Sequence, residues 1–155
     1  MKPLFLAFWL LCVVPITPAF SQHIAVCGEV AGTSYHPFSG NVPQDQTGWT
    51  PNGISKGKFT LMRLAKDKYD FLFLDATGAI TSAVHDGGSV IKMRQGKNNV
   101  TFLVGYPEGA IEVRTFLIDL AGTKQVIYLA SKGGDHMPIQ KGSLFAGDRE
   151  TIQFD

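Results

Sequence analysis

The sequence predicts an all-β domain, an antiparallel meander of about eight short strands that forms either a small barrel or a two-sheet sandwich. From residue 54 onward, short runs rich in Val, Ile, Phe, Thr and Tyr are separated by turn residues. The turns recur about 8 to 12 residues apart, a spacing typical of sandwiches and barrels. No segment keeps a helical period of apolar residues with capping residues at its ends.

Eight runs are expected to be strands, and two of them show alternation with a period of two residues. In 110–119, the set Ile111, Val113, Thr115 and Leu117 alternates with Glu112, Arg114, Phe116 and Ile118. In 91–94 the same alternation predicts that Lys92 and Arg94 point outward. The runs are KFTLMRLA, YDFLFLD, AITSAVH, SVIKMRQ, NVTFLVGY, AIEVRTFLID, KQVIYLAS, and a last stretch from SLFA to TIQF.

The eight runs also suggest an internal duplication. Residues 71–78 and 115–122 are both apolar runs that end in Asp-x-x-Gly, and Gly-Gly follows at 87 and at 133. Residues 94–96 and 140–142 continue the parallel, at an offset of 44 to 46 residues. A propeller needs at least about four blades, so we expect two four-strand repeats that form one domain.

The N-terminal residues have the features of a secretory signal. One lysine precedes an apolar run from Leu4 to Val14, and Ala19 and Ser21 occupy the positions that a signal peptidase reads. The run is shorter than the roughly 20 residues that cross a bilayer. We expect 1–21 to be cleaved, which leaves a secreted or periplasmic protein with no stable membrane span. Residues 22–53 and 54–155 then form one domain.

The charge balance gives no sign of a nucleic-acid partner. The chain has 14 basic and 13 acidic residues, and loss of Lys2 with the signal leaves 13 of each. The basic residues are scattered singly, whereas a nucleic-acid binder presents a basic stripe.

Cys27 is the only thiol of the expected mature chain, because Cys12 leaves with the signal. A buried apolar role is one interpretation, and a disulfide-linked dimer through Cys27 is another.

The stretch 33–53 is expected to be a long loop. It contains three prolines, three glycines and the aromatic residues Tyr35, Phe38 and Trp49. Long loops with aromatic residues are often functional. The three side chains either cover a ligand pocket or plug one end of the domain.

Two turns carry paired histidine and aspartate. His85 and Asp86 stand at a hairpin tip before Gly87 and Gly88, which supply the positive φ of a tight turn. Asp135 and His136 follow the second Gly-Gly. If the two tips converge, two imidazoles and two carboxylates would suit zinc or another divalent ion.

The sequence favours a non-catalytic binding protein with no cofactor. Tyr35, Phe38 and Trp49, or an adjoining barrel mouth, would contact a small apolar molecule or a protein partner. One alternative is a metal-dependent hydrolase or metal-binding protein that uses His85, Asp86, Asp135 and His136. A second alternative is a structural component of the cell envelope that associates with itself.

Overall fold

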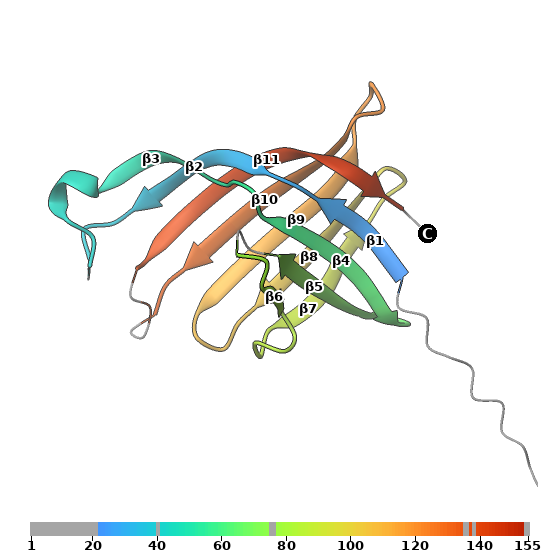
Figure 1. Cartoon of the computed structure of the whole chain (residues 1–155), viewed down its shortest axis with the longest axis horizontal. Coiled ribbons are helices and arrows are strands. Elements are labelled where there is room, and N and C mark those ends of the chain that lie inside the picture. Colours follow the sequence, from blue (N-terminus) through green and yellow to red (C-terminus); the bar gives the residue numbers. More distant parts are fainter. Residues whose placement is uncertain (1–21, 40, 75–76, 135–136, 138, 154–155) are drawn as a thin grey trace, which may run out of the picture.

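The computed structural model describes residues 22–39, 41–74, 77–134, 137 and 139–153, and 65% of these residues lie in strands, all of them antiparallel (Figure 1). Its elements are β1 (Gln22–Cys27), β2 (Val30–His36), the 3-10 helix η1 (Gln44–Gln46), β3 (Gly48–Ile54), β4 (Lys58–Ala65), β5 (Lys68–Leu74), β6 (Ile80–Ser82), β7 (Ser89–Gln95), β8 (Asn99–Gly105), β9 (Ala110–Ile118), β10 (Lys124–Lys132) and β11 (Lys141–Ile152). Each of the eight runs expected after residue 54 contains a strand, β4 to β11, although in the run 79–85 only Ile80–Ser82 is a strand.

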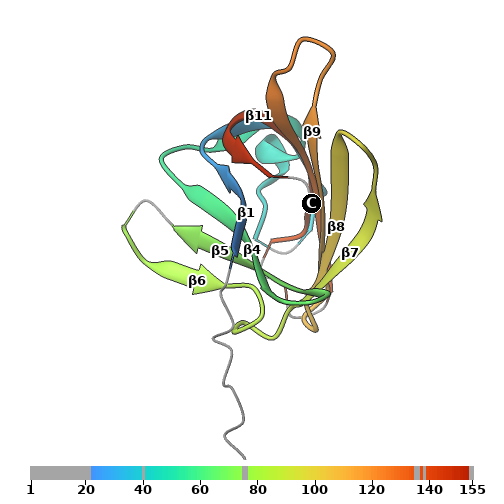
Figure 2. The ribbon, with the colours of Figure 1, turned by 90° about the vertical axis from the view of Figure 1, so that its right-hand side faces the viewer.

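The strands form two sheets that share β11 and face each other (Figure 2). Sheet A has five strands in the order β6-β5-β4-β1-β11, and sheet B has seven in the order β3-β2-β11-β10-β9-β8-β7. The sheets do not close into a barrel. The predicted all-β class is confirmed, and the architecture is consistent with the two-sheet sandwich.

Strand β11 changes partners along its length. It pairs with β2 up to Ala146 and with β10 up to Asp148, and from Arg149 it pairs with β1. Gly147 lies at the change, where an added Cβ would be only 2.5 Å from the Glu29 carbonyl oxygen. Glycine is therefore required where the two chain segments approach.

The prediction of a long loop over 33–53 is wrong at both of its ends, 33–36 and 48–53, which are strands. Strands β2 and β3 pair from Val30 opposite Ile54 to His36 opposite Gly48, which leaves 37–47 as the connection. Pro51 made this stretch resemble a loop, because proline is rare inside strands. Because β3 is an edge strand, a proline without an N–H is tolerated there.

The two expected four-strand repeats do not have matching strand pairing. After β6, the chain crosses to sheet B, where β7 pairs with β8. After β10, by contrast, the next strand, β11, pairs with β10 itself. The described strands therefore do not support two equivalent halves.

The core lies between the inner faces of the two sheets. Phe71 of sheet A meets Phe102 and Phe116 of sheet B, with ring centroids 5.9 and 6.1 Å apart. Cys27 is fully buried in this core.

The expected orientation of β7 is only half right. Arg94 is exposed, but Lys92 turns inward, with its Nζ 5.5 Å from the centroid of the Tyr69 ring. Ile91 and Met93 are exposed instead. A bulge between Lys92 and Arg94 shifts the register of β7 against β8 and so alters which side chains share a face.

Candidate functional site

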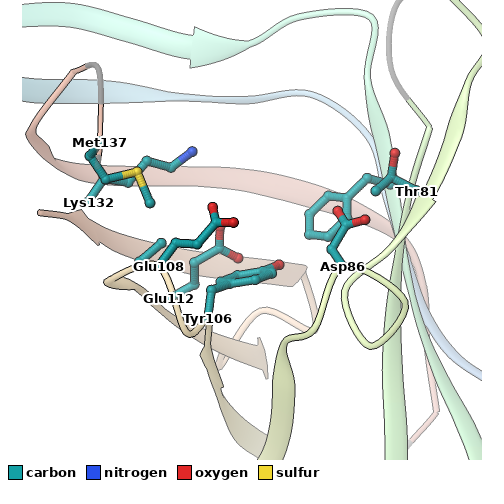
Figure 3. Close-up of a pocket in the computed structure, with 9 residues that line it drawn as sticks. Thr81, Asp86, Tyr106, Glu108, Glu112, Lys132 and Met137 are labelled. Carbon is teal, nitrogen blue, oxygen red and sulfur yellow. The ribbon is translucent and has the colours of Figure 1, made fainter. Parts of the chain in front are cut away.

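A cavity of about 500 Å³ opens to solvent at one end of the sandwich, where residues of three inter-strand connections line it. Figure 3 shows the carboxylates of Glu108 and Glu112 beside the Tyr106 ring, with Lys132 and Met137 on one side and Asp86 and Thr81 on the other. The residues that line the cavity are Phe73, Thr81, Asp86, Tyr106, Glu108, Ala110, Glu112, Lys132 and Met137.

A buried aspartate on β5 holds the turn that carries Asp86. Asp70 accepts hydrogen bonds from the Ser82 hydroxyl at 2.7 Å and from the Val84 amide at 3.1 Å. Gly87 has φ +82°, and a Cβ at Gly88 would lie 2.9 Å from the Tyr106 ring. The predicted positive φ is confirmed at Gly87 alone, and the predicted hairpin is wrong, because β6 pairs with β5 and β7 pairs with β8, so the turn joins the two sheets. Its glycines let it pack against the cavity wall.

The turn between β8 and β9 supplies Tyr106 and Glu108. The Tyr106 amide donates to the Ala110 carbonyl at 2.8 Å, which closes the turn. Gly109 has φ +96°, and an added Cβ would lie 2.1 Å from the Gly133 carbonyl. The backbone therefore comes close enough to place the end of β10, with Lys132, at the same cavity.

Glu112 reaches the cavity from the inner face of β9, and its carboxylate is held from behind. The Tyr128 hydroxyl donates to Glu112 Oε1 at 2.8 Å, and Arg114 Nη2 donates to Glu112 Oε2. Both Glu112 and Arg114 are buried. A buried charge is stable only when paired and hydrogen-bonded, which this arrangement provides.

Aromatic rings surround the Arg114 guanidinium. Its Cζ lies 4.3 to 5.0 Å from the centroids of four rings, which are those of Phe59, Phe71, Phe73 and Tyr128. Its Nε and Nη1 have no hydrogen-bond partner in the described part of the chain. Attraction to the ring faces partly replaces the missing hydrogen bonds.

Three groups near the cavity have shifted pKa values. Burial, followed by the Glu112 charge, raises the pKa of Tyr106 to about 12. The same two causes raise the pKa of Tyr128 above its usual range. Burial, followed by the charge of Lys132, lowers the pKa of Lys141. Both tyrosines are therefore neutral at physiological pH and can donate their hydroxyl protons.

The lining of the cavity is negative on balance. Asp86, Glu108 and Glu112 contribute three carboxylates against the single ammonium of Lys132. Adding Arg114, which lies behind Glu112, still leaves one excess negative charge. Carboxylates beside the faces of aromatic rings suit a positively charged group.

The predicted aromatic residues lie elsewhere. Tyr35, Phe38 and Trp49 are exposed by 43%, 72% and 67%, and none of them lines the cavity between the sheets. The Tyr35 and Trp49 rings are 5.4 Å apart on the outer side of sheet B. Trp49 borders a separate outer groove of about 420 Å³.

The predicted metal ligands are only partly placed. Asp86 lines the cavity and His85 is exposed, whereas Asp135 and His136 lie outside the described residues. Met137 lines the same cavity as Asp86, so the two turns share one end of the sandwich. Within the described ranges, no group of three or more His, Cys, Asp or Glu side chains could hold a metal ion.

Sequence reasoning did not find the Glu112, Arg114 and Tyr128 cluster. The period-two pattern of 110–119 was correct, but the pattern does not say which face is buried. Hydrophobicity favours the face of Ile111, Val113 and Leu117, whereas the structure buries Glu112, Arg114 and Phe116. The sequence did contain one signal for this cluster. Glu112 and Arg114, which carry opposite charges, lie two residues apart and therefore on the same face of the strand as Phe116.

Fold and site together define a two-sheet β-sandwich with a cavity between its sheets that carries a buried acidic group. No family model, curated protein or solved structure matches the chain. Among the described residues, no helix has the length and hydrophobicity needed to cross a membrane.

Proposed function

We propose that the protein is a non-catalytic binding protein that holds a small molecule in the cavity between its sheets. The volume of about 500 Å³ suits a small ligand, since such sites measure about 300 to 1,000 Å³. Phe73, Tyr106 and Met137 offer contacts to an apolar body, and the carboxylates offer fixed polar contacts. Export, with removal of 1–21, is part of this proposal, and the intact mass of the purified protein tests it.

The observation that carries the proposal is the position of Glu112. Its carboxylate lines the cavity, yet it is anchored by Tyr128 and Arg114 and cannot swing away without breaking both contacts. A binding group held in place loses little conformational entropy when the ligand arrives. We infer that the ligand has an apolar body and a positively charged group that meets this end of the cavity.

Three probes with six carbon atoms each test both parts of the proposal. Hexylamine, hexanol and hexanoate are each titrated into the isotope-labelled protein, and amide chemical shifts are followed by NMR. Hexylamine should shift the amides of Asp86, Tyr106 and Glu108 and bind most tightly. If none of the probes shifts these amides, the cavity does not bind such molecules. If hexanoate binds as tightly as hexylamine, the inferred charge of the ligand is wrong.

A matched pair of variants locates the effect. Glu108→Gln removes one exposed carboxylate from the cavity and should weaken hexylamine binding by a few fold, the usual worth of an exposed charge. Asp45→Asn removes an exposed carboxylate in η1 and should leave the affinity unchanged. Equal losses in both variants would indicate a general charge effect rather than a site.

A divalent metal ion is a second candidate occupant. It is favoured by the convergence of the two predicted turns, because Asp86 and Met137 line the same cavity. Native mass spectrometry of the purified protein, with and without added zinc, tests it. A bound ion that disappears in a His85→Ala, His136→Ala double variant would support this candidate, and the bare protein mass at excess zinc would exclude it.

A further inference from the structure

Three neighbouring rows of side chains on the outer face of sheet B are uncharged across six strands. The strand register places these side chains in three cross-strand rows from β8 to β3. None of the 18 positions holds a charged residue. The rows are Leu103, Val113, Leu129, Leu144, Thr33 and Pro51; Thr101, Thr115, Ile127, Ala146, Ala31 and Gly53; and Gly105, Ile111, Ser131, Gly142, Tyr35 and Trp49.

Large apolar side chains of this face are open to solvent. Ile111, Leu129 and Leu144 are 51%, 44% and 46% exposed, and Trp49 is 67% exposed. An antiparallel sheet with one solvated face normally alternates apolar inner residues with polar outer residues. A contiguous exposed apolar patch marks an interaction surface.

The same face carries both a projection and a groove. Trp49 projects at one side, with Tyr35 packed against its ring. Next to Trp49 lies the groove of about 420 Å³, whose walls include Ile111, Leu129 and Leu144. A two-fold dimer needs such a self-complementary patch, in which one feature fits another on the partner's identical surface.

We propose that two copies of this chain associate through the outer faces of sheet B, with each Trp49 against the groove of the other copy. Two uncharged faces meet without opposing like charges and without burying an unpaired charge. A second copy is the favoured occupant for that reason. An anionic membrane surface would instead attract Lys or Arg, and the rows contain neither.

The extent of the face agrees with what a dimer requires. Six strands about 4.8 Å apart span roughly 29 Å, and three rows about 6.8 Å apart cover roughly 20 Å. The face therefore offers on the order of 600 Å² in projection. A standard interface buries about 800 Å² of accessible surface per partner, and accessible surface exceeds the projected area.

Sedimentation velocity of the purified protein over a range of concentrations tests the proposal. The wild type should show a concentration-dependent shift from monomer to dimer. Leu129→Asp should weaken dimerisation at least tenfold, because a carboxylate would be buried at the centre of the rows. The matched control is Leu120→Asp, because Leu120 is fully exposed outside the rows, in the turn between β9 and β10, and this variant should dimerise like the wild type.

Trp49→Ala provides a second variant on the edge strand β3, in case Leu129→Asp disturbs folding. It should also weaken dimerisation. Trp49 fluorescence gives an independent signal, because the other tryptophan, Trp9, lies in the expected signal segment. Its emission should shift to shorter wavelength as the dimer forms.

Three results would overturn the proposal. One is a wild-type monomer at every soluble concentration. The second is a dimer that neither Leu129→Asp nor Trp49→Ala weakens. The third is a monomer that binds phosphatidylcholine vesicles through Trp49 and Leu129, which would assign the face to lipid. None of these results bears on ligand binding in the cavity, which is on the other side of sheet B.

Discussion

Glu112 and Arg114 point the same way from β9, and Arg114 Nη2 donates a hydrogen bond to Glu112 Oε2. The two residues are separated by one position, so both lie on the inner face of the strand. One carboxylate thereby neutralises an arginine buried among aromatic rings and also lines the solvent-open cavity. The stability of the core and the binding properties of the cavity depend on the same side chain.

Glu112→Gln should lower the free energy of unfolding by about 3 to 5 kcal/mol, because it leaves the Arg114 charge buried without its partner. Urea denaturation measures the change. Replacing both residues, with Glu112→Gln and Arg114→Met, should recover most of the stability, since no buried charge remains. Glu108→Gln is the control on the exposed wall of the cavity, and it should change stability by no more than about 0.5 kcal/mol. A double variant less stable than Glu112→Gln alone would contradict this account.

Tyr106 in the cavity wall and Tyr128 behind Glu112 should make the protein sensitive to alkali. The folded state raises the pKa of Tyr106 to about 12 and raises that of Tyr128 as well, so it holds both protons more tightly than the unfolded chain does. From about pH 10 to about pH 12 the unfolded chain releases these protons first, and the free energy of unfolding should fall as pH rises. Below about pH 10 this contribution should be constant.

Phenolate absorbance and urea denaturation across this pH range measure the two effects. Tyr106→Phe and Tyr128→Phe should each remove one late-ionising phenol and reduce the pH dependence. If both variants keep the wild-type titration curve, the tyrosines that ionise late are others.

Asp70→Ala should destabilise the turn at residues 83–88. The substitution leaves the Ser82 hydroxyl and the Val84 amide without the acceptor that Asp70 provides. An unsatisfied buried donor costs about 1 to 3 kcal/mol. Amide hydrogen exchange should therefore increase at Val84 and its neighbours, and Asp70→Asn, which keeps one acceptor oxygen, should show a smaller increase. Unchanged exchange at Val84 would show that Asp70 does not hold the turn.

Cys27 should be unreactive in the folded protein. Its side chain has no exposed surface, because it lies in the core on the inner face of β1. A thiol reagent should label it only when urea unfolds the chain, and a non-reducing gel should show a monomer. A disulfide-linked dimer on that gel would contradict the buried position and would favour the alternative interpretation of this cysteine.

The local pattern of the sequence determined the all-β class and the eight strands after residue 54. Alternation, β-branched and aromatic residues, and glycine turns depend on near neighbours in the chain, so single-sequence reasoning detects them. The glycine turn beside His85 and Asp86 was predicted on the same basis. Strands β2 and β3 were missed because their glycines and Pro51 resemble loop sequence, and only pairing at a sheet edge makes them strands.

The tertiary structure alone decided which face of each strand is buried and how the two sheets meet. A period of two residues is symmetric between the faces, so the pattern at Ile111 and Glu112 fits either orientation. Burial of Glu112 and Arg114 is stable only because Phe59, Phe71 and Phe73 arrive from the opposite sheet and Tyr128 from the neighbouring strand. These contacts join residues far apart in the chain. The cavity and the uncharged outer face therefore follow from the packing of the two sheets and from the strand register, which no short stretch of sequence encodes.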